Sequence, residues 1–449
     1  MTSVLDSILL QNNFSTPAIR SIWSDDNKIS KQLAVEAALA KIEGDLGIIP
    51  KSAADKIVEK AKVDNFDFLS LQKESAEKRH SLIALIHALQ EEVGGKEGEF
   101  VYYGVTTQDI VDTGIMLQTK EAYNIILDHT KDLISTLAKL TKEHRSTLMI
   151  GRTHGIHAIP ITFGFKLSIW LDELLRSQRR LKQLLENDVF VGSISGAVGS
   201  YASFFGRGRE VEKAVLKELG LAVPNISWQP SRDRFSEFAS VLGIFSGTLG
   251  KIGRELFTLM KTEIDEVHEP FKKGEVGSST MPQKRNPALI EGLASLTQPV
   301  FKDVDLMFQS LLIDGERDAI HWRNEWVALP EITSYLDAQI VNATYILSGL
   351  KVNKDKMLDN LNKQGALPYS ERIMFEVGLK LGKQTAHEIV YQAAMTALEE
   401  NKDFIDLVYS DERVRLNFTK EDILSWVDPK NNIGECLEKV DEVLSQVTI

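Results

Sequence analysis

Hydrophobic residues along this chain recur mainly at three- and four-residue steps, the spacing of an amphipathic α-helix. One stripe of this kind runs through residues 167–185, where arginines occupy the other faces and read as a solvated surface. Its apolar members are Leu167, Trp170, Leu171, Leu174, Leu175, Leu181, Leu184 and Leu185. The pattern predicts one long helix.

A second long segment, residues 235–267, is apolar on several faces and is interrupted by glycines. Each interior glycine costs a helix roughly 1 kcal/mol relative to alanine, so we interpret these positions as points where another helix approaches closely in a buried bundle. They are Gly243, Gly247, Gly250 and Gly253. Two further long helices are predicted over 288–312 and 329–350.

No alternating strand pattern is long enough to form a sizeable sheet, so the predicted fold is all-α. We expect three helical domains, covering residues 1–105, 106–353 and 354–449, with the longest helices in a central bundle. The boundaries follow a glycine- and threonine-rich loop near Gly104 and the end of the last bundle helix near Lys354. Such long helices leave apolar surface exposed on a single bundle, and this predicts self-association through it.

Composition narrows the classes of function. A chain of 449 residues with a formal charge of −12 lacks the basic surface that non-specific nucleic-acid binding needs. The single cysteine, Cys436, excludes an intrachain disulfide and a cysteine-built zinc site. We see no signal peptide and no membrane-spanning run, and we expect a cytoplasmic protein.

The segment with the richest chemistry is residues 277–287, GSSTMPQKRNP. Its two prolines prevent a helix or a central strand, and its polarity does not suit a core. Ser278 is a candidate proton acceptor, while Lys284 and Asn286 are suited to stabilising a developing oxyanion. The alternative is a solvated surface loop.

Two other polar segments interrupt the helices. Residues 104–113, GVTTQDIVDT, either cap a helix or hold a carboxylate with hydroxyls and free amides. Residues 151–160 contain His154, and histidine is the natural general acid near neutral pH. We predict no metal site, because no partner cluster has a zinc-ligand spacing. Glu291, early in an apolar helix, either complements the helix dipole or orients a histidine.

In their order along the chain, these segments resemble the three substrate regions of the fumarase/aspartase superfamily. That superfamily eliminates a group β to a carboxylate and commonly releases fumarate. The resemblance covers essentially the whole chain. It implies an α-helical homotetramer with a central bundle, active sites assembled from three subunits, a small dicarboxylate substrate and no cofactor.

The resemblance also implies roles for individual residues. Ser278 matches the base that removes the Cβ proton, and such a serine needs desolvation and positive potential to ionise. Lys284 and Asn286 match the groups that stabilise the aci-carboxylate. His154, paired with Glu291, matches the acid that protonates the leaving group. The positions matched to substrate binding are Arg79, His80, Thr106, Thr107, Arg317, Trp322 and Trp326.

Two branches of the superfamily share the resemblance. Residues 14–25, 316–331 and 426–429 resemble carboxymuconate cycloisomerases. The stretch 152–158 with its His154, together with Glu291, resembles adenylosuccinate lyase instead.

The residues that would hold a nucleotide phosphate are mostly missing. Arg317 remains, but Trp322 and Trp326 stand where that family has a serine and a second arginine. Its amino-terminal arginine-tyrosine pair is replaced by Asn13 and Phe14. The lost donors would leave a phosphate poorly solvated, at a cost of several kcal/mol. The alternative, that the tryptophans only pack the bundle, would not restore them.

We therefore predict a β-elimination lyase that releases fumarate from a non-phosphorylated succinyl conjugate, either S-succinylcysteine or an N-succinyl amino acid. The alternatives are 3-carboxy-cis,cis-muconate cycloisomerase and, third, adenylosuccinate lyase. A non-catalytic structural relative belongs to a different class, and the complete set of catalytic positions argues against it.

Overall fold

A computed structural model describes residues 3–447, so the outermost residues of the two predicted end domains lie outside it. The chain forms two compact units. Unit 1 contains Met1–Thr130, Arg176–Gly250 and Ser295–Val341, and unit 2 contains Lys131–Leu175, Lys251–Ala294 and Asn342–Ile449. The three-domain division at 105/106 and 353/354 stays a prediction.

Long helices dominate the fold, and four of them contribute residues to both units: α7 (Thr107–Glu143), α8 (Phe163–Glu186), α10 (Asp233–Leu259) and α13 (Asn324–Ser348). Helix α8 confirms the first predicted stripe, although Leu185 is 47% exposed and does not belong to the buried face. Helix α10 ends earlier than predicted, and Val267 lies in a short strand. Helix α13 begins earlier than predicted, at Asn324.

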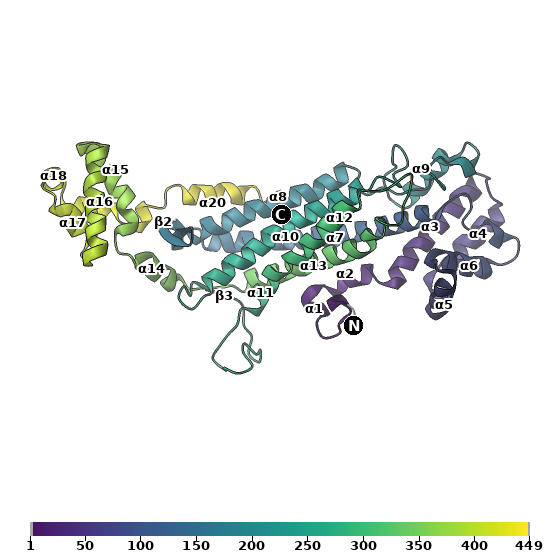
Figure 1. Ribbon diagram of the computed structural model, residues 1–449, viewed down its shortest axis with the longest axis horizontal. Coiled ribbons are helices and arrows are strands. Elements are labelled where there is room, and N and C mark those ends of the chain that lie inside the picture. Colours follow the sequence, from purple (N-terminus) through teal and green to yellow (C-terminus); the bar gives the residue numbers. More distant parts are fainter. Residues whose placement is uncertain (1–2, 448–449) are drawn as a thin grey trace. The chain divides into compact units, whose positions relative to one another are not determined.

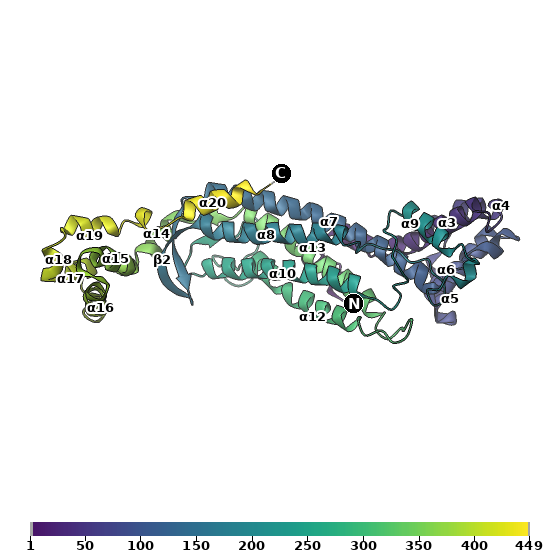
Figure 2. The same cartoon turned by 90° about the horizontal axis from the view of Figure 1, so that it is seen from above.

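The glycines of α10 mark close helix packing, as predicted. A Cβ on Gly243 would lie 2.8 Å from Val304 Cγ2, and a Cβ on Gly250 would lie 2.2 Å from Thr297 Oγ1. Both partners belong to α12 (Thr297–Gln309), which runs beside α10 (Figure 2). Only a residue without a side chain permits this approach.

The single helix predicted over 288–312 is wrong. The structure has α11 (Ala288–Ser295) and then α12, with a break at Leu296. Pro299 lies in the first turn of α12, where it has no N–H to donate to the Ser295 carbonyl and its ring crowds that carbonyl. A proline is tolerated in a first turn, so the helix restarts there.

Among the amino-terminal helices of unit 1, α2 and α4 pack against α3, as does α9, while α6 packs against α4 and α5 (Figure 1). The Ser24 side chain caps α3 by accepting the Asn27 amide. The helices are α1 (Gln11–Phe14), α2 (Pro17–Ile22), α3 (Asp25–Asp45), α4 (Lys51–Lys60), α5 (Phe68–Lys78), α6 (Ser81–Val93) and α9 (Gly208–Glu218). Short 3₁₀ turns cover Val4–Asp6, Val63–Asn65, Glu97–Phe100 and Ala202–Phe204.

Unit 2 contains the strands, which form two antiparallel pairs. Strand β1 (Leu148–Thr153) pairs with β2 (Ile156–Thr162), and β3 (Val267–His268) pairs with β4 (Lys351–Val352). The sheets are small and the fold is all-α as predicted, but the β1–β2 hairpin was not predicted from the sequence.

The rest of unit 2 is helical, and α15 to α19 share a hydrophobic core (Figure 2). The elements are α14 (Lys354–Asn362), α15 (Ser370–Leu381), α16 (Lys383–Glu400), α17 (Phe404–Ser410), α18 (Glu412–Arg415), α19 (Lys420–Trp426) and α20 (Cys436–Ser445), with 3₁₀ turns at Leu367–Tyr369 and Pro429–Asn431. None of the helices between residues 3 and 447 combines the length and apolarity of a membrane span.

Candidate active site

The polar loop of residues 277–287 lies in unit 2, in the long excursion between β3 and α11 (Figure 1). Its two ends meet, because the Asn286 amide donates to the Gly277 carbonyl oxygen at 3.2 Å. A Cβ on Gly277 would lie 2.6 Å from the Lys284 carbonyl oxygen, so this closure requires glycine. The Arg285 guanidinium lies 4.7 Å from the ring centroid of Phe271 and attaches the loop to the unit.

Ser278 is the half-buried hydroxyl of this loop. Its Oγ accepts the Met281 amide at 3.1 Å and the Thr280 amide at 3.4 Å. Backbone donors aimed at a hydroxyl oxygen favour its ionised form over its neutral form. The turn that follows Ser278 therefore supplies part of the positive potential that a serine base needs.

A hollow of about 760 Å³ lies beside the loop and is lined by Lys284 and Asn286. Its other lining groups come from the end of α10 and the turn after it, from β3 and the residues directly after it, and from β4. Four cationic side chains and two carboxylates line the hollow: Lys261, Lys284, Arg285 and Lys351, and Asp265 and Glu269. The excess of cations suits an anionic ligand.

His154 lies in the two-residue turn at the tip of the β1–β2 hairpin, within the polar segment that the sequence indicated. Its φ is +53° and that of Gly155 is +81°, so both central residues of the two-residue turn between Thr153 and Ile156 are left-handed. Two-residue hairpin turns of this kind match the twist of the strands, and histidine tolerates the left-handed region better than most residues. The turn presents the His154 side chain to solvent.

The base of the hairpin is attached by an ion pair. Arg152 donates to both carboxylate oxygens of Glu266, at 3.0 and 2.6 Å, and the Glu266 side chain is fully buried. Asn360 of α14 also donates to this carboxylate, at 2.8 Å. These bonds fix the strand that carries His154.

Glu291 lies in the first turn of α11 and is exposed. No hydrogen bond or ion pair joins it to His154 among the residues described, so the predicted pair remains a prediction. The buried acid here is Glu269, whose carboxylate accepts the Ile290 amide at 3.0 Å and so caps α11. Burial raises the pKa of Glu269 above its ordinary value, against the lowering effect of these amides.

Several of the predicted substrate-binding residues meet in unit 1. Arg317 donates to Thr106 Oγ1 at 2.9 Å, and Thr107 Oγ1 lies 3.4 Å from His80 Nε2. His80 also caps α6, since its Nδ1 accepts the Ile83 amide. Arg79 does not join them; it is exposed and ends α5 with a φ of +54°.

Tyr102 is a member of this cluster that the sequence did not indicate. Its hydroxyl donates to Thr107 Oγ1 at 3.3 Å, and its amide donates to the buried carboxylate of Glu36 at 3.1 Å. Its φ of +62° is strained for a tyrosine. Burial raises the pKa of its hydroxyl to about 12, so the hydroxyl stays a donor at neutral pH.

The start of α7 is held by the buried carboxylate of Asp109. It accepts the amides of Thr106, Ser195 and Gly196 at 3.1, 3.0 and 2.8 Å, and the Ser193 hydroxyl at 2.7 Å. Burial raises the pKa of Asp109, while these donors lower it. The contacts fix Thr106 and Thr107 at the start of α7.

The two tryptophans have different surroundings. Trp322 is buried and donates its indole N–H to Asp112 at 2.7 Å. Asp112 also pairs with the fully buried Arg232, which bridges it to Glu325. Trp326 packs edge-to-face on Trp322 at 5.1 Å but is 41% exposed.

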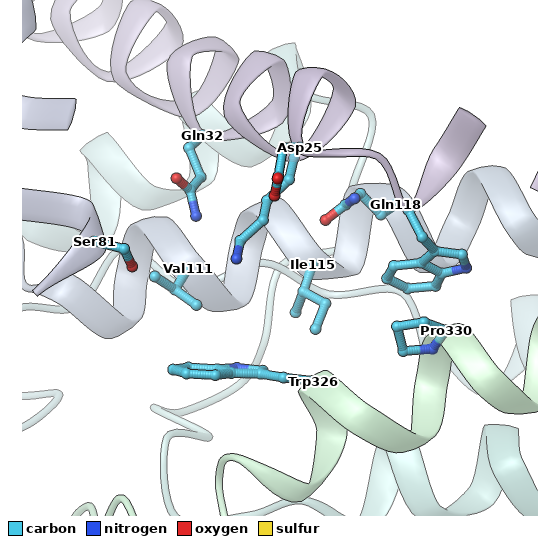
Figure 3. Close-up of a pocket in the computed structure, with 10 residues that line it drawn as sticks. Asp25, Gln32, Ser81, Val111, Ile115, Gln118, Trp326 and Pro330 are labelled. Carbon is cyan, nitrogen blue, oxygen red and sulfur yellow. The ribbon is translucent and has the colours of Figure 1, made fainter. Parts of the chain in front are cut away.

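Trp326 lines a separate pocket of about 150 Å³ in unit 1. In Figure 3, Gln32 of α3 and Trp326 of α13 lie on opposite sides of the space, with Val111 and Ile115 of α7 between them. The full lining is Trp23, Asp25, Lys28, Gln32, Ser81, Val111, Ile115, Gln118, Trp326 and Pro330.

The sequence did not indicate Lys28, Gln32 or Glu269, because no local motif marks a residue whose neighbours come from distant segments. A polar residue on the inner face of α3, such as Gln32, was the available signal. Across residues 3–447, no three His, Cys, Asp or Glu side chains gather as metal ligands would.

Comparison with known proteins agrees with this architecture. The family described as "Lyase" matches residues 10–301, and the family described as "Adenylosuccinate lyase C-terminus" matches residues 366–443. The N-acetyl-S-(2-succino)cysteine lyase of Enterococcus italicus is 54% identical over 98% of this chain and 97% of its own. The protein of that name from Dickeya dadantii is 49% identical over the same shares.

Among solved structures, the 3-carboxy-cis,cis-muconate lactonizing enzyme of Pseudomonas putida superposes with a TM-score of 0.90. It is 32% identical, with 97% of this chain and 98% of the other covered. The chain therefore belongs to the Lyase family, within the fumarase/aspartase superfamily.

Proposed function

We propose that this chain is a fumarate-forming lyase that cleaves the C–S bond of an S-(2-succino)cysteine, with the N-acetylated cysteine as the preferred leaving thiol. The observation that carries the elimination chemistry is the Ser278 oxygen, which two backbone amides approach in a loop that also bears Lys284 and Asn286. The names of the two relatives support the choice of conjugate.

In this reaction Ser278, ionised, takes the proton from the succinyl Cβ. The electron pair moves into the adjacent carboxylate, and Lys284 and Asn286 stabilise the resulting aci-carboxylate. Its collapse forms the C=C bond of fumarate and breaks the C–S bond. The sulfur leaves as a thiolate, which takes a proton from His154, so the products are fumarate and a thiol.

Threonines, an arginine and a histidine in unit 1 hold the substrate carboxylates in this proposal. Thr106 and Arg317 are already joined, as are Thr107 and His80. Hydroxyl and guanidinium donors in this arrangement are suited to a carboxylate.

A homotetramer with shared sites is part of the proposal, as is a cytoplasmic location. The homotetramer is supported by the superfamily resemblance. It is also supported by the exposure of His154 and Glu291, which have no hydrogen bond or ion pair with each other among the described residues. A second chain can complete a site that one chain leaves open.

The second candidate is a cycloisomerase that forms a lactone from carboxymuconate. It is supported by residues 14–25 and by the similarity to the lactonizing enzyme. His154 and Glu291 favour the lyase, because protonation of a leaving group has no place in a reaction that expels none.

The test is fumarate release, followed by ultraviolet absorbance, from N-acetyl-S-(2-succino)cysteine, S-(2-succino)cysteine, N-succinyl amino acids and adenylosuccinate. Carboxymuconate is run in parallel for lactone formation. We expect fumarate from the thioethers and its loss in Ser278→Ala, while Ser279→Ala in the same loop keeps activity. Lactone without fumarate from any substrate would select the cycloisomerase.

A further inference from the structure

The pocket beside Trp326 is lined by two polar side chains, Gln32 and Lys28, for which the described residues provide no hydrogen-bond or ion-pair partner. Gln32 is only 7% exposed and lines the pocket, yet its side-chain amide makes no hydrogen bond among the described residues. The amide reaches solvent through the pocket, so its donor and acceptor groups are available to a ligand that enters it. Lys28 lies one helical turn earlier on α3 and also has no ion-pair partner in the described chain.

The rest of the lining is largely apolar and aromatic. Indole rings from Trp23 and Trp326 and the aliphatic side chains of Val111 and Ile115 surround the space. At about 150 Å³ it is smaller than the roughly 300–1,000 Å³ of pockets for drug-sized ligands. It suits a small group that is partly apolar, not a nucleotide.

The pocket lies along the face of α7 that also carries Thr107, one of the candidate carboxylate contacts. Thr107, Val111 and Ile115 are spaced four residues apart and so lie on one side of the helix. A rise of about 1.5 Å per residue places Val111 about 6 Å and Ile115 about 12 Å beyond Thr107. A succinyl group held at Thr107 would extend its substituent into the pocket.

We infer that this pocket binds the leaving group as an N-acylated amino acid, with the Gln32 amide recognising the acylamino group and Lys28 pairing with the free carboxylate. This rests on the proposed function. The Gln32 side chain offers both a donor and an acceptor, which match the C=O and N–H of an acylamino group. A leaving group with a free α-ammonium would instead place its positive charge near the Lys28 cation. It also has no acyl C=O that could accept a hydrogen bond from Gln32.

Asp25 is the carboxylate of the lining, one turn before Lys28. It is exposed at the start of α3 and forms no ion pair with Lys28 within 4 Å. Its charge opposes binding of an anionic leaving group, so its removal has the opposite expected effect to removal of Lys28.

The experiment compares kcat/KM for fumarate release from three thioethers: N-acetyl-S-(2-succino)cysteine, the same compound with the cysteine carboxylate converted to a carboxamide, and S-(2-succino)cysteine with a free amine. We expect the wild type to prefer the N-acetyl carboxylate. Lys28→Gln lowers kcat/KM about tenfold for the carboxylate, the size of one charge-assisted hydrogen bond, and leaves the carboxamide unchanged. Asp25→Asn raises kcat/KM for the carboxylate.

Gln32→Met keeps the length of the side chain and removes its hydrogen bonds, so it should reduce the preference for the N-acetyl over the free-amine substrate. Lys73→Gln, an exposed lysine on α5, is the matched charge control and changes none of these ratios. Equal losses for carboxylate and carboxamide in Lys28→Gln, or an unchanged acetyl preference in Gln32→Met, would overturn the assignment. Absence of fumarate from every thioether in the wild type would overturn the proposed function instead.

Discussion

The carboxyl group of Glu43 provides a test of how much one buried charge costs this fold. Its side chain lies on α3 with 0% exposure, and neither carboxylate oxygen has a hydrogen-bond partner among the described residues. Burial, with a smaller contribution from the charge of Glu36, raises its pKa from 4.5 to about 8. We therefore expect Glu43→Gln, a neutral side chain of the same shape, to stabilise the protein at alkaline pH.

The sign and size follow from proton linkage. Between pH 4.5 and about 8 the folded chain binds more protons at Glu43 than the unfolded chain does. Its contribution to stability is therefore complete below pH 4.5 and is lost as the pH rises through about 8. At about 1.36 kcal/mol per pH unit, this window corresponds to roughly 4–5 kcal/mol as an upper bound.

The assay is the urea unfolding midpoint by circular dichroism at pH 5 and pH 9, at one fixed protein concentration because association changes apparent stability. Glu43→Gln should match the wild type at pH 5 and exceed it by a few kcal/mol at pH 9. Some pH dependence remains, since burial also raises the pKa of Glu36 to about 8. Glu91→Gln, an exposed glutamate on α6, is the control. An identical pH dependence in Glu43→Gln and wild type would refute the reasoning.

Three further predictions concern packing, the hairpin and the leaving group. Gly250→Ala places a Cβ 2.2 Å from Thr297 Oγ1 and should destabilise by about 1–3 kcal/mol in thermal melting, with recovery when Thr297→Ala is added. Arg152→Met leaves the buried Glu266 without its cation and should cost about 3–5 kcal/mol, and an unchanged melting temperature would contradict the ion-pair account. His154→Ala should slow an N-succinyl amino acid far more than a thioether, because a thiol with pKa about 8.5 leaves without much acid assistance; equal losses in kcat would contradict its role as general acid.

Much of the helical architecture could be predicted from the spacing of apolar residues. The three- and four-residue steps that put apolar side chains on one face of a helix are visible in the local sequence. The α10 glycines even indicated close packing, which Val304 and Thr297 of α12 now explain. The break before α12 was missed, although Pro299 was visible. The β1–β2 hairpin was missed because its strands are short and its turn depends on a left-handed histidine, His154.

The candidate site was only partly accessible from the sequence. Ser278, Lys284 and Asn286 share one short loop, so a linear motif was enough to indicate them. Gln32 of α3 and Trp326 of α13 are far apart in the chain and meet only after folding. The pairing of His154 with Glu291 stays a prediction, since no hydrogen bond or ion pair joins the two side chains among the described residues.

The buried charges of unit 1 give a physical reason to expect no phosphorylated substrate beside Trp322. The indole N–H of Trp322 already donates to Asp112, and the guanidinium of Arg232 is divided between Asp112 and Glu325. A phosphate entering there would compete with two carboxylates in a region that excludes water, where like charges repel strongly.

Arg317 is joined to Thr106 Oγ1, and in the proposed function this pair binds a carboxylate of the substrate. The neighbouring pocket offers the single ammonium of Lys28, opposed by Asp25, and indole faces in place of further donors. One ammonium is sufficient for a carboxylate, whereas a phosphate dianion needs several donors. In the proposed function, these charges therefore favour a small carboxylate over the phosphate of a nucleotide, independently of any motif.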